Sequence, residues 1–439
     1  MKGSLCVRIV SLILSVCVLC SGCSMIGADV ENQLIPPQND VEQNAMQNAL
    51  NAQLQTQNFV LTYPTGGDYR TPFVVLNQIR KPEVITPTPT VPEKTESNIL
   101  DGWGLVFYRY TTGNAKTRIH VLRKDEEGVW NTVADIEGFG TEIGDVNFAD
   151  LTGDGFPELL LGWTLYGTVE KRLEIYRIDK QLETIACDVT YAFLTTADLT
   201  SDGAEDIVLM HPHNGEQRVE VQLLTAHERE LRFRGKTKLD KGVAQVSHVL
   251  RAALSPTVTG LYMDCKKDCD TTITELVYWN GTSLESPFSD DVTDTNTMTS
   301  RNGKLFCRDI DGDGEVEWPI SREDGLTDWV SYDFRAGESI TKFSSVVNIE
   351  DGYLIRLRPE WQDPETTSIS FIPEERVIYL EDKGTEQRFL EIMTVSADEK
   401  FDLPEGYRYI GEKQKKKYAV RVDSDIITLE EAQYVFVAL

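Results

Sequence analysis

The sequence predicts a mainly β protein, in which a β-propeller of about five blades is followed by a small α/β sandwich domain. From residue 59 onward, apolar runs such as GLVFYRY, RIHVLR, ELLLGW and RLEIYRI alternate with turn residues. Loops that begin with aspartate recur at positions 150, 198 and 309. The first two are 48 residues apart and the third follows after roughly two periods of ~55, which is typical of propeller blades of about four strands.

The N-terminus resembles the signal peptide of a bacterial lipoprotein. A basic start with Lys2 and Arg8 precedes an apolar stretch over Ile9–Leu19, and two small residues come just before Cys23. We expect residues 1–22 to be cleaved and Cys23 to be lipidated, which would anchor the protein to the cell membrane on its extracytoplasmic side. An uncleaved transmembrane helix is the alternative, but the apolar stretch is shorter than the ~20 residues that a span needs.

Residues 23–58 are expected to form a flexible tether, because they are rich in Asn, Gln and Ala and poor in aromatic residues. The formal net charge of the chain is −28, and loss of Lys2 and Arg8 with the signal peptide makes it −30. A surface this acidic opposes nucleic acid and suits cations. We therefore expect no nucleic-acid partner.

The three recurrent loops share a nine-residue pattern of oxygen-bearing side chains. Position 1 is Asp, position 3 is Thr or Asp, positions 5 and 6 are Asp-Gly, and position 9 is Glu or Asp. Ca²⁺ takes six to eight oxygen ligands, and these side chains with the carbonyl of position 7 could supply them. The predicted calcium ligands are Asp150, Thr152, Asp154, Glu158, Asp198, Thr200, Asp202, Asp206, Asp309, Asp311, Asp313 and Glu317.

These loops are not EF-hands, since position 12 is Leu161, Leu209 or Ile320 instead of a bidentate Glu. A solvated Asp-Gly turn is the alternative for each of them. The loop at Asp309 favours calcium most, because all four of its side-chain positions are acidic. A threonine at position 3 makes the other two loops weaker candidates.

The loop pattern resembles the FG-GAP or VCBS repeats of integrin-type propellers. That resemblance implies calcium bound between the first two strands of a blade. It extends over residues 59–343, and this whole region resembles the VCBS-repeat lipoproteins of Gram-positive anaerobes. Two further repeat positions, near 99–110 and 248–264, have lost most of their acidic residues. An array of β-sandwiches is the alternative to a propeller.

Residues 344–439 are expected to form a separate domain. Strand-like runs such as GYLIRLRPEWQ and RFLEIMTVS end in TLEEAQYVFVAL, which has an amphipathic helical pattern. This resembles the PsbP-like α/β sandwich, in which a Pro-x-Trp turn, here Pro359-Glu360-Trp361, opens the sheet. The resemblance implies a binding module.

Cys265 and Cys269 are close enough in sequence to close a small disulfide loop in an exported protein, with free thiols as the alternative. No further cysteine pair or nearby histidine completes a zinc set around them.

No nucleophile elbow, HExxH motif or Gly-rich phosphate loop appears, so no catalytic residue is assigned. The sequence favours a surface-exposed, calcium-binding module or scaffold that recognises an extracellular protein or glycan. The alternative is a carbohydrate-active hydrolase that uses carboxylates of the propeller.

Overall fold

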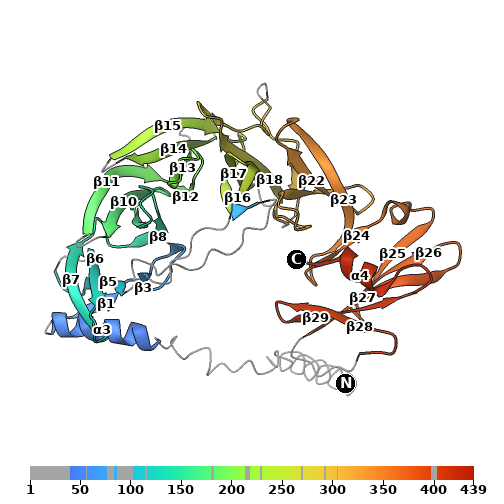
Figure 1. Ribbon diagram of the computed structural model, residues 1–439, viewed down its shortest axis with the longest axis horizontal. Helices are drawn as coiled ribbons and strands as arrows, with labels where there is room; N and C mark the ends of the chain where they lie inside the picture. The colour runs from blue at the N-terminus through green and yellow to red at the C-terminus, as the bar shows by residue number, and fades with distance from the viewer. Residues whose placement is uncertain are drawn as a thin grey trace, which may run out of the picture.

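The structure is a computed structural model that is mainly β, as the sequence predicts. It describes residues 40–55, 57–76, 84–86, 102–113, 116–178, 182–212, 218–227, 230–267, 270–290, 293–303, 305–396 and 403–439. Six sheets occur in this part of the chain, and Figure 1 shows that they follow one another along an arc. The expected signal peptide and Cys23 lie outside the described residues.

The first three sheets are mainly antiparallel. The first contains β1 (Phe59–Leu61), β3 (Phe73–Val75), β5 (Trp103–Tyr110), β6 (Thr117–Lys124) and β7 (Trp130–Glu137). The second contains β2 (Gly66–Gly67), β8 (Ile143–Ala149), β9 (Glu158–Thr164), β10 (Lys171–Ile178) and β11 (Leu182–Tyr191). The third contains β12 (Phe193–Ala197), β13 (Asp206–Pro212), β14 (Val219–His227) and β15 (Glu230–Lys238).

The other three sheets complete the arc. The fourth contains β4 (Val84–Ile85), β16 (Gln245–Ser255), β17 (Val258–Lys266), β18 (Thr271–Trp279), β19 (Leu284–Glu285) and β20 (Arg301–Asn302). The fifth contains β21 (Glu317–Ser321), β22 (Thr327–Asp333), β23 (Glu338–Asn348), β24 (Tyr353–Leu357) and β30 (Phe436–Ala438). The sixth contains β25 (Thr367–Ile372), β26 (Val377–Asp382), β27 (Gln387–Ser396), β28 (Arg408–Lys413) and β29 (Lys416–Val422).

Consecutive sheets pack face to face, and each pair shares a hydrophobic cluster. The packing of β9 on both of its faces explains why its sequence is an unbroken apolar run. Leu159 and Leu161 point toward the first sheet, whereas Leu160 points toward the third. Because side chains alternate along a strand, a sheet covered on both sides needs apolar residues at successive positions.

The boundary expected at residue 344 is not a boundary between domains. Strand β23 runs over Glu338–Asn348 without interruption, and β24 pairs with both β23 and β30. The C-terminal helix α4 (Leu429–Val435) and the 3₁₀ turn η2 (Pro359–Trp361) contribute to the core between the fifth and sixth sheets. The fifth sheet therefore joins the two regions that the sequence analysis separates.

Residues 41–54 belong to the expected tether but form helix α3 (Val41–Leu54), which packs on the first sheet. The side chain of Asp40 caps the helix by accepting a hydrogen bond from the Gln43 amide at 2.7 Å. Met46, Leu50 and Leu54 recur every four residues and are buried against the first sheet. The tether prediction fails here because this apolar stripe has a sheet face to cover.

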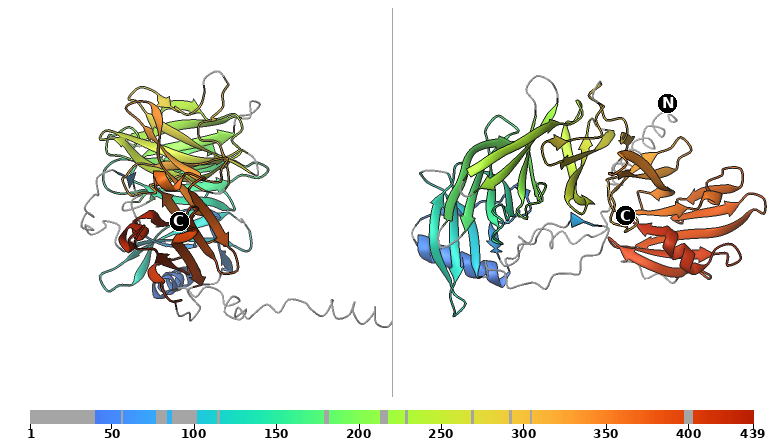
Figure 2. Two further views of the ribbon diagram at one scale, coloured as in Figure 1. Left: turned by 90° about the vertical axis from the view of Figure 1, so that its right-hand side faces the viewer. Right: turned by 45° about the horizontal axis from the view of Figure 1, so that its top comes forward.

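The sheet is shaped to receive the helix. A Cβ atom on Gly104 would lie 2.6 Å from Cε of Met46, so the glycine lets the end of this methionine side chain lie directly against the strand. Figures 1 and 2 show α3 and the sixth sheet at opposite ends of the arc. In the described part of the chain, no helix is long and apolar enough to cross a membrane.

Replacing Leu50 by alanine tests whether α3 belongs to the folded core. Leu50 is fully buried, so Leu50→Ala should lower the free energy of unfolding by about 2–5 kcal/mol, as large-to-small core substitutions do. Urea denaturation followed by tryptophan fluorescence measures this change. Val41→Ala, at an exposed position of the same helix, should change it by less than about 0.5 kcal/mol. Equal, small effects of both substitutions would show that the helix does not pack.

Candidate functional site

The three acidic loops occupy equivalent places in three sheets. The first loop joins β8 to β9, the second joins β12 to β13, and the third leads into β21. In each loop the acidic residue at position 9, which is Glu158, Asp206 or Glu317, is the first residue of the following strand. All three of these side chains are buried, so the pattern places a carboxyl group inside the fold three times.

The aspartate at position 1 holds each loop in shape. Each such carboxylate accepts two hydrogen bonds from backbone amides of its own loop. Asp309, for example, accepts from Gly312 at 2.7 Å and from Gly314 at 3.0 Å. Asp150 makes the matching pair of bonds with Gly153 and Gly155, and Asp198 accepts from Asp202 and Gly203. The glycine at position 6 has a positive φ, +83° at Gly314, which a residue with a side chain rarely adopts.

The carboxylate at position 9 binds back to the start of its loop. Each accepts a hydrogen bond of 2.9 Å from the backbone amide at position 2, which belongs to Leu151, Leu199 or Ile310. In the first two loops the threonine hydroxyl at position 3 also donates to this carboxylate. Both carboxylate oxygens of Glu158 and Asp206 are therefore occupied by the protein itself.

The third loop leaves one buried carboxylate oxygen without a partner. Oε1 of Glu317 is buried and accepts no hydrogen bond, whereas Oε2 accepts from the Ile310 amide. Asp309, Asp311 and Glu317 each offer a carboxylate oxygen, and these three atoms lie within 4.8 Å of one another. An all-oxygen group of this kind suits a hard divalent cation.

The aspartates at position 5 of the first and third loops contact basic side chains. Asp154 pairs with Arg177. Asp313 lies 2.7 Å from Nζ of Lys342, which also contacts Glu315 at 2.8 Å. Of the four acidic side chains predicted to surround one ion in the third loop, the structure thus gathers three, while Asp313 faces Lys342 of β23.

Neighbouring loops also touch one another along one end of the sheets. The Glu205 amide donates to the Asp150 carbonyl at 2.7 Å, which links the second loop to the first. The Ser201 hydroxyl donates to the Thr257 carbonyl at 2.8 Å, in the turn between β16 and β17. The repeat position near 248–264, which lacks the acidic pattern, is this hairpin of the fourth sheet.

Cys265 is a free thiol, contrary to the predicted disulfide with Cys269. Along β17 its side chain points with Leu261 and Met263 into the core between the third and fourth sheets, where it is fully buried. Cys269 lies outside the described residues. Cys265 does not lie at a loop tip, as a small disulfide loop with Cys269 would need, because β17 continues to Lys266.

The structure contains a second group of possible metal ligands, which the sequence analysis does not identify. In the structure His248, Asp264 and Cys307 bring a nitrogen, an oxygen and a sulfur within 4.8 Å of one another. They come from three separate segments, so no short sequence motif contains all three. The register of β16 on β17, which pairs His248 with Asp264, brings the first two together.

A groove of about 470 Å³ lies where the fifth and sixth sheets meet. Its apolar lining comes from β23, the turn that follows it, β25 and β26, and includes Val346, Ile349, Ile369, Phe371 and Ile378. Ile349 and Phe371 are exposed. The groove is the candidate ligand surface of the C-terminal part of the chain.

No family model matches this chain, and no curated protein matches it. Among solved structures, Sqt1 of Saccharomyces cerevisiae is similar at a TM-score of 0.33 and 8% identity, covering 77% of this chain and 92% of that one. The rhamnogalacturonan lyase YesW is similar at 0.32 and 11%, covering 64% and 60%. TolB of Acinetobacter baumannii is similar at 0.24 and 9%, covering 62% and 58%. The matched structures include β-propeller-like folds, but TM-scores this low decide neither blade number nor activity.

Burial raises the pKa of Glu317 to about 8 and the pKa values of Glu158 and Asp206 to about 7. A carboxyl group whose pKa is higher in the folded state stabilises the fold only while protonated. Without divalent cations, the free energy of unfolding should therefore fall as pH rises from about 4.5 through about 8. Glu317 alone should contribute roughly 1–4 kcal/mol of this loss.

Urea denaturation in the presence of a chelator, at about pH 5.5 and about pH 8, measures the effect. Glu317→Gln imitates the protonated acid and should reduce the difference between the two values. Glu126→Gln, at an exposed position, should leave the difference unchanged. If the Glu317 variant keeps the full pH dependence, this carboxyl group is not the source.

Proposed function

We propose that this protein is a lipid-anchored, extracytoplasmic binding or scaffold module, whose propeller of FG-GAP or VCBS type is braced by Ca²⁺. The observation that supports it most is the unpartnered Oε1 of Glu317, buried beside Asp309 and Asp311. A buried carboxylate oxygen without a hydrogen bond costs free energy, which a cation would recover. The donor set is entirely oxygen, as Ca²⁺ requires.

The residues of the third loop fit the ion well. Asp309, Asp311 and Glu317 would hold it, and its charge would offset the mutual repulsion of their carboxylates. The first and second loops fit it less well, because a cation there would have to replace hydrogen bonds that Thr152 and Thr200 already make. Calcium would therefore brace the third loop first.

On this proposal each of the six sheets is one blade. The sequence predicts about five blades, because it assigns residues 344–439 to a separate domain. Five hydrophobic clusters support this view, because each lies between two consecutive sheets. The acidic loops then lie at one end of the second, third and fifth blades. Bracing them would stiffen the rim of the array.

The anchor and the binding role rest on different parts of the chain. Cys23, after its apolar segment, supports attachment to the membrane from outside the cytoplasm. The apolar groove that includes Ile349 and Phe371 offers a surface to an extracellular protein or glycan. The net charge of −28 supports a partner other than nucleic acid.

Calcium should stabilise the purified protein against heat, and Asp311→Asn should remove much of this effect. Binding to the folded state alone stabilises by RT ln(1 + [Ca²⁺]/Kd), which is about 2.7 kcal/mol per site at a hundredfold excess over Kd. Differential scanning calorimetry with chelator, Ca²⁺ or Mg²⁺ measures the shift. Mg²⁺ should act weakly, because it dehydrates reluctantly.

Asp333→Asn is the matched control. Asp333 also accepts two hydrogen bonds from the backbone of its own exposed turn, but it belongs to no group of three carboxylates in the described part of the chain. This variant should keep the full calcium response. A melting temperature that is indifferent to chelator and calcium would overturn the bracing role.

Lipidation should depend on Cys23 alone. In cells supplied with a labelled fatty acid, the unaltered protein and a Cys20→Ala variant should incorporate label and fractionate with membranes. Cys23→Ala should incorporate none, because it lacks the sulfur that is acylated. Unchanged labelling of the Cys23→Ala protein would contradict the proposed anchor.

A further inference from the structure

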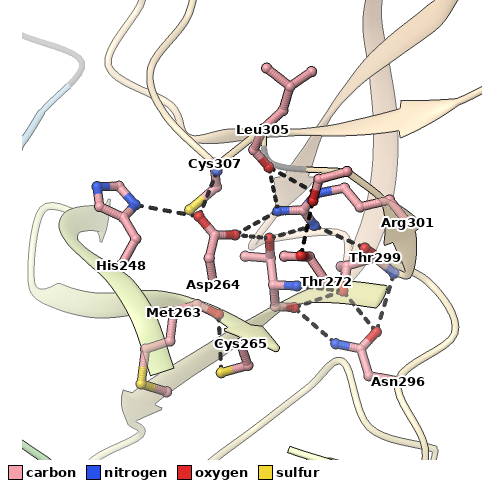
Figure 3. Close-up of polar contacts among 12 residues, drawn as sticks. His248, Met263, Asp264, Cys265, Thr272, Asn296, Thr299, Arg301, Leu305 and Cys307 are labelled. Carbon is pink, nitrogen blue, oxygen red and sulfur yellow. Dashed lines mark hydrogen bonds and ion pairs between the residues drawn. The ribbon is translucent and has the colours of Figure 1, made fainter. Parts of the chain in front are cut away.

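A group of three different donor atoms lies between the fourth and fifth sheets, apart from the acidic loops. His248 comes from β16, Asp264 from β17, and Cys307 from the segment that precedes β21. Figure 3 shows the three side chains converging. Asp264 and Cys307 are fully buried, whereas one third of the His248 side chain is exposed.

The carboxylate of Asp264 is oriented by its neighbours. Its Oδ1 accepts hydrogen bonds from Arg301 at 2.6 Å and from the Thr274 hydroxyl at 2.7 Å. Its Oδ2 accepts from the Cys307 amide at 2.8 Å and lies 3.3 Å from Nδ1 of His248. One oxygen is thus committed to Arg301, and the other faces the histidine and the cysteine.

Arg301 is itself fixed, so that the carboxylate has a rigid support. Its guanidinium donates to the carbonyls of Thr299 and Leu305 and to the Thr274 hydroxyl. The charge of Arg301 offsets that of the buried carboxylate. Supports of this kind typically orient metal ligands, and their loss commonly costs 10–100-fold in affinity.

The imidazole of His248 is also held in place. It stacks on the ring of Phe306 with 5.3 Å between the centroids and 18° between the planes. Phe306 directly precedes Cys307, so the segment that supplies the sulfur also positions the histidine. The partial exposure of His248 gives an ion a route to the two buried ligands.

We propose that His248, Asp264 and Cys307 bind a borderline divalent cation, Zn²⁺, with water as the fourth ligand on the His248 side. Zinc takes nitrogen, sulfur and oxygen ligands at ~2.0–2.3 Å in a tetrahedron, which places ligand atoms ~3.3–3.8 Å apart. Nδ1 of His248 and Oδ2 of Asp264 are already 3.3 Å apart. Cys307 binds as the thiolate and releases its proton to solvent.

The chemistry of this site differs from that of the acidic loops. Calcium prefers oxygen alone, whereas a thiolate and an imidazole favour zinc and cobalt. The ion would join β16 and β17 of the fourth sheet to the segment entering the fifth. It would therefore cross-link two sheets, and its binding does not depend on the proposed calcium role.

Cobalt substitution tests the proposal, because Co²⁺ bound to a thiolate absorbs in the near ultraviolet by charge transfer. The purified, reduced full-length protein, kept in excess Ca²⁺ to occupy the carboxylate loops, should bind one Co²⁺ with this band. Zn²⁺ should displace it. Cys307→Ser and His248→Ala should weaken binding by more than about 100-fold, beyond the usual effect of losing a supporting residue.

Cys265→Ser is the matched control, because Cys265 is also buried on β17 but points to the opposite face from Asp264. It should keep the band. His248→Ala changes a partly exposed side chain, and circular dichroism confirms that each variant is folded. Absence of the band from the unaltered protein, its persistence in a folded Cys307 or His248 variant, or its equal loss in Cys265→Ser would overturn the metal site and leave a hydrogen-bond network.

Discussion

Burial of both faces of the sheets is the constraint on which this molecule depends. A sheet in the middle of the arc touches a neighbour on each side, as β9 does through Leu159 on one face and Leu160 on the other. Apolar side chains must then fill both faces, and little room is left for polar groups in the middle of a strand. The three acidic loops accordingly place their buried carboxyl groups at the starts of strands, and Asp264, a buried acid inside a strand, is paired with Arg301.

The buried acids show what this constraint demands. Glu158 and Asp206 sit at strand starts, where amides and threonine hydroxyls of their own loops satisfy them. Asp264 lies inside a strand and is satisfied by Arg301. Glu317 accepts a hydrogen bond at only one carboxylate oxygen, and its other oxygen, Oε1, is buried without a partner. These four acids thus meet three different environments, and of the four only Glu317 keeps a buried oxygen without a hydrogen-bond partner.

The parts of the fold that repeat were predictable from the sequence. Strand-like runs indicated a mainly β protein, and the Asp-Gly pattern placed three loops at the starts of β9, β13 and β21, because turn chemistry is local. The position of α3 was not predictable, since its apolar stripe shows that a partner exists but not which one. The false boundary at residue 344 has a similar cause, because a change in composition does not reveal that one sheet spans it.

The group of His248, Asp264 and Cys307 could not be predicted either, because its side chains meet only through long-range contacts. His248 and Asp264 meet through the register of two strands, and Cys307 comes from the segment that leads into the next sheet. Pairings over such separations leave no pattern within a short window of sequence. The acidic loops could be recognised for the opposite reason, since each contains all of its own candidate ligands.

The pairing of β24 with β30 has a consequence for the order in which the chain can fold. All strands of the sixth sheet lie between these two in sequence, yet β30 completes the fifth sheet. The edge of β24 in the fifth sheet therefore stays unpaired until the sixth sheet has been synthesised and β30 has returned to pair with it. Contacts between such distant segments are slow to form. The last two sheets should accordingly gain and lose their structure together, as one cooperative unit, while the earlier sheets can form as soon as they leave the ribosome.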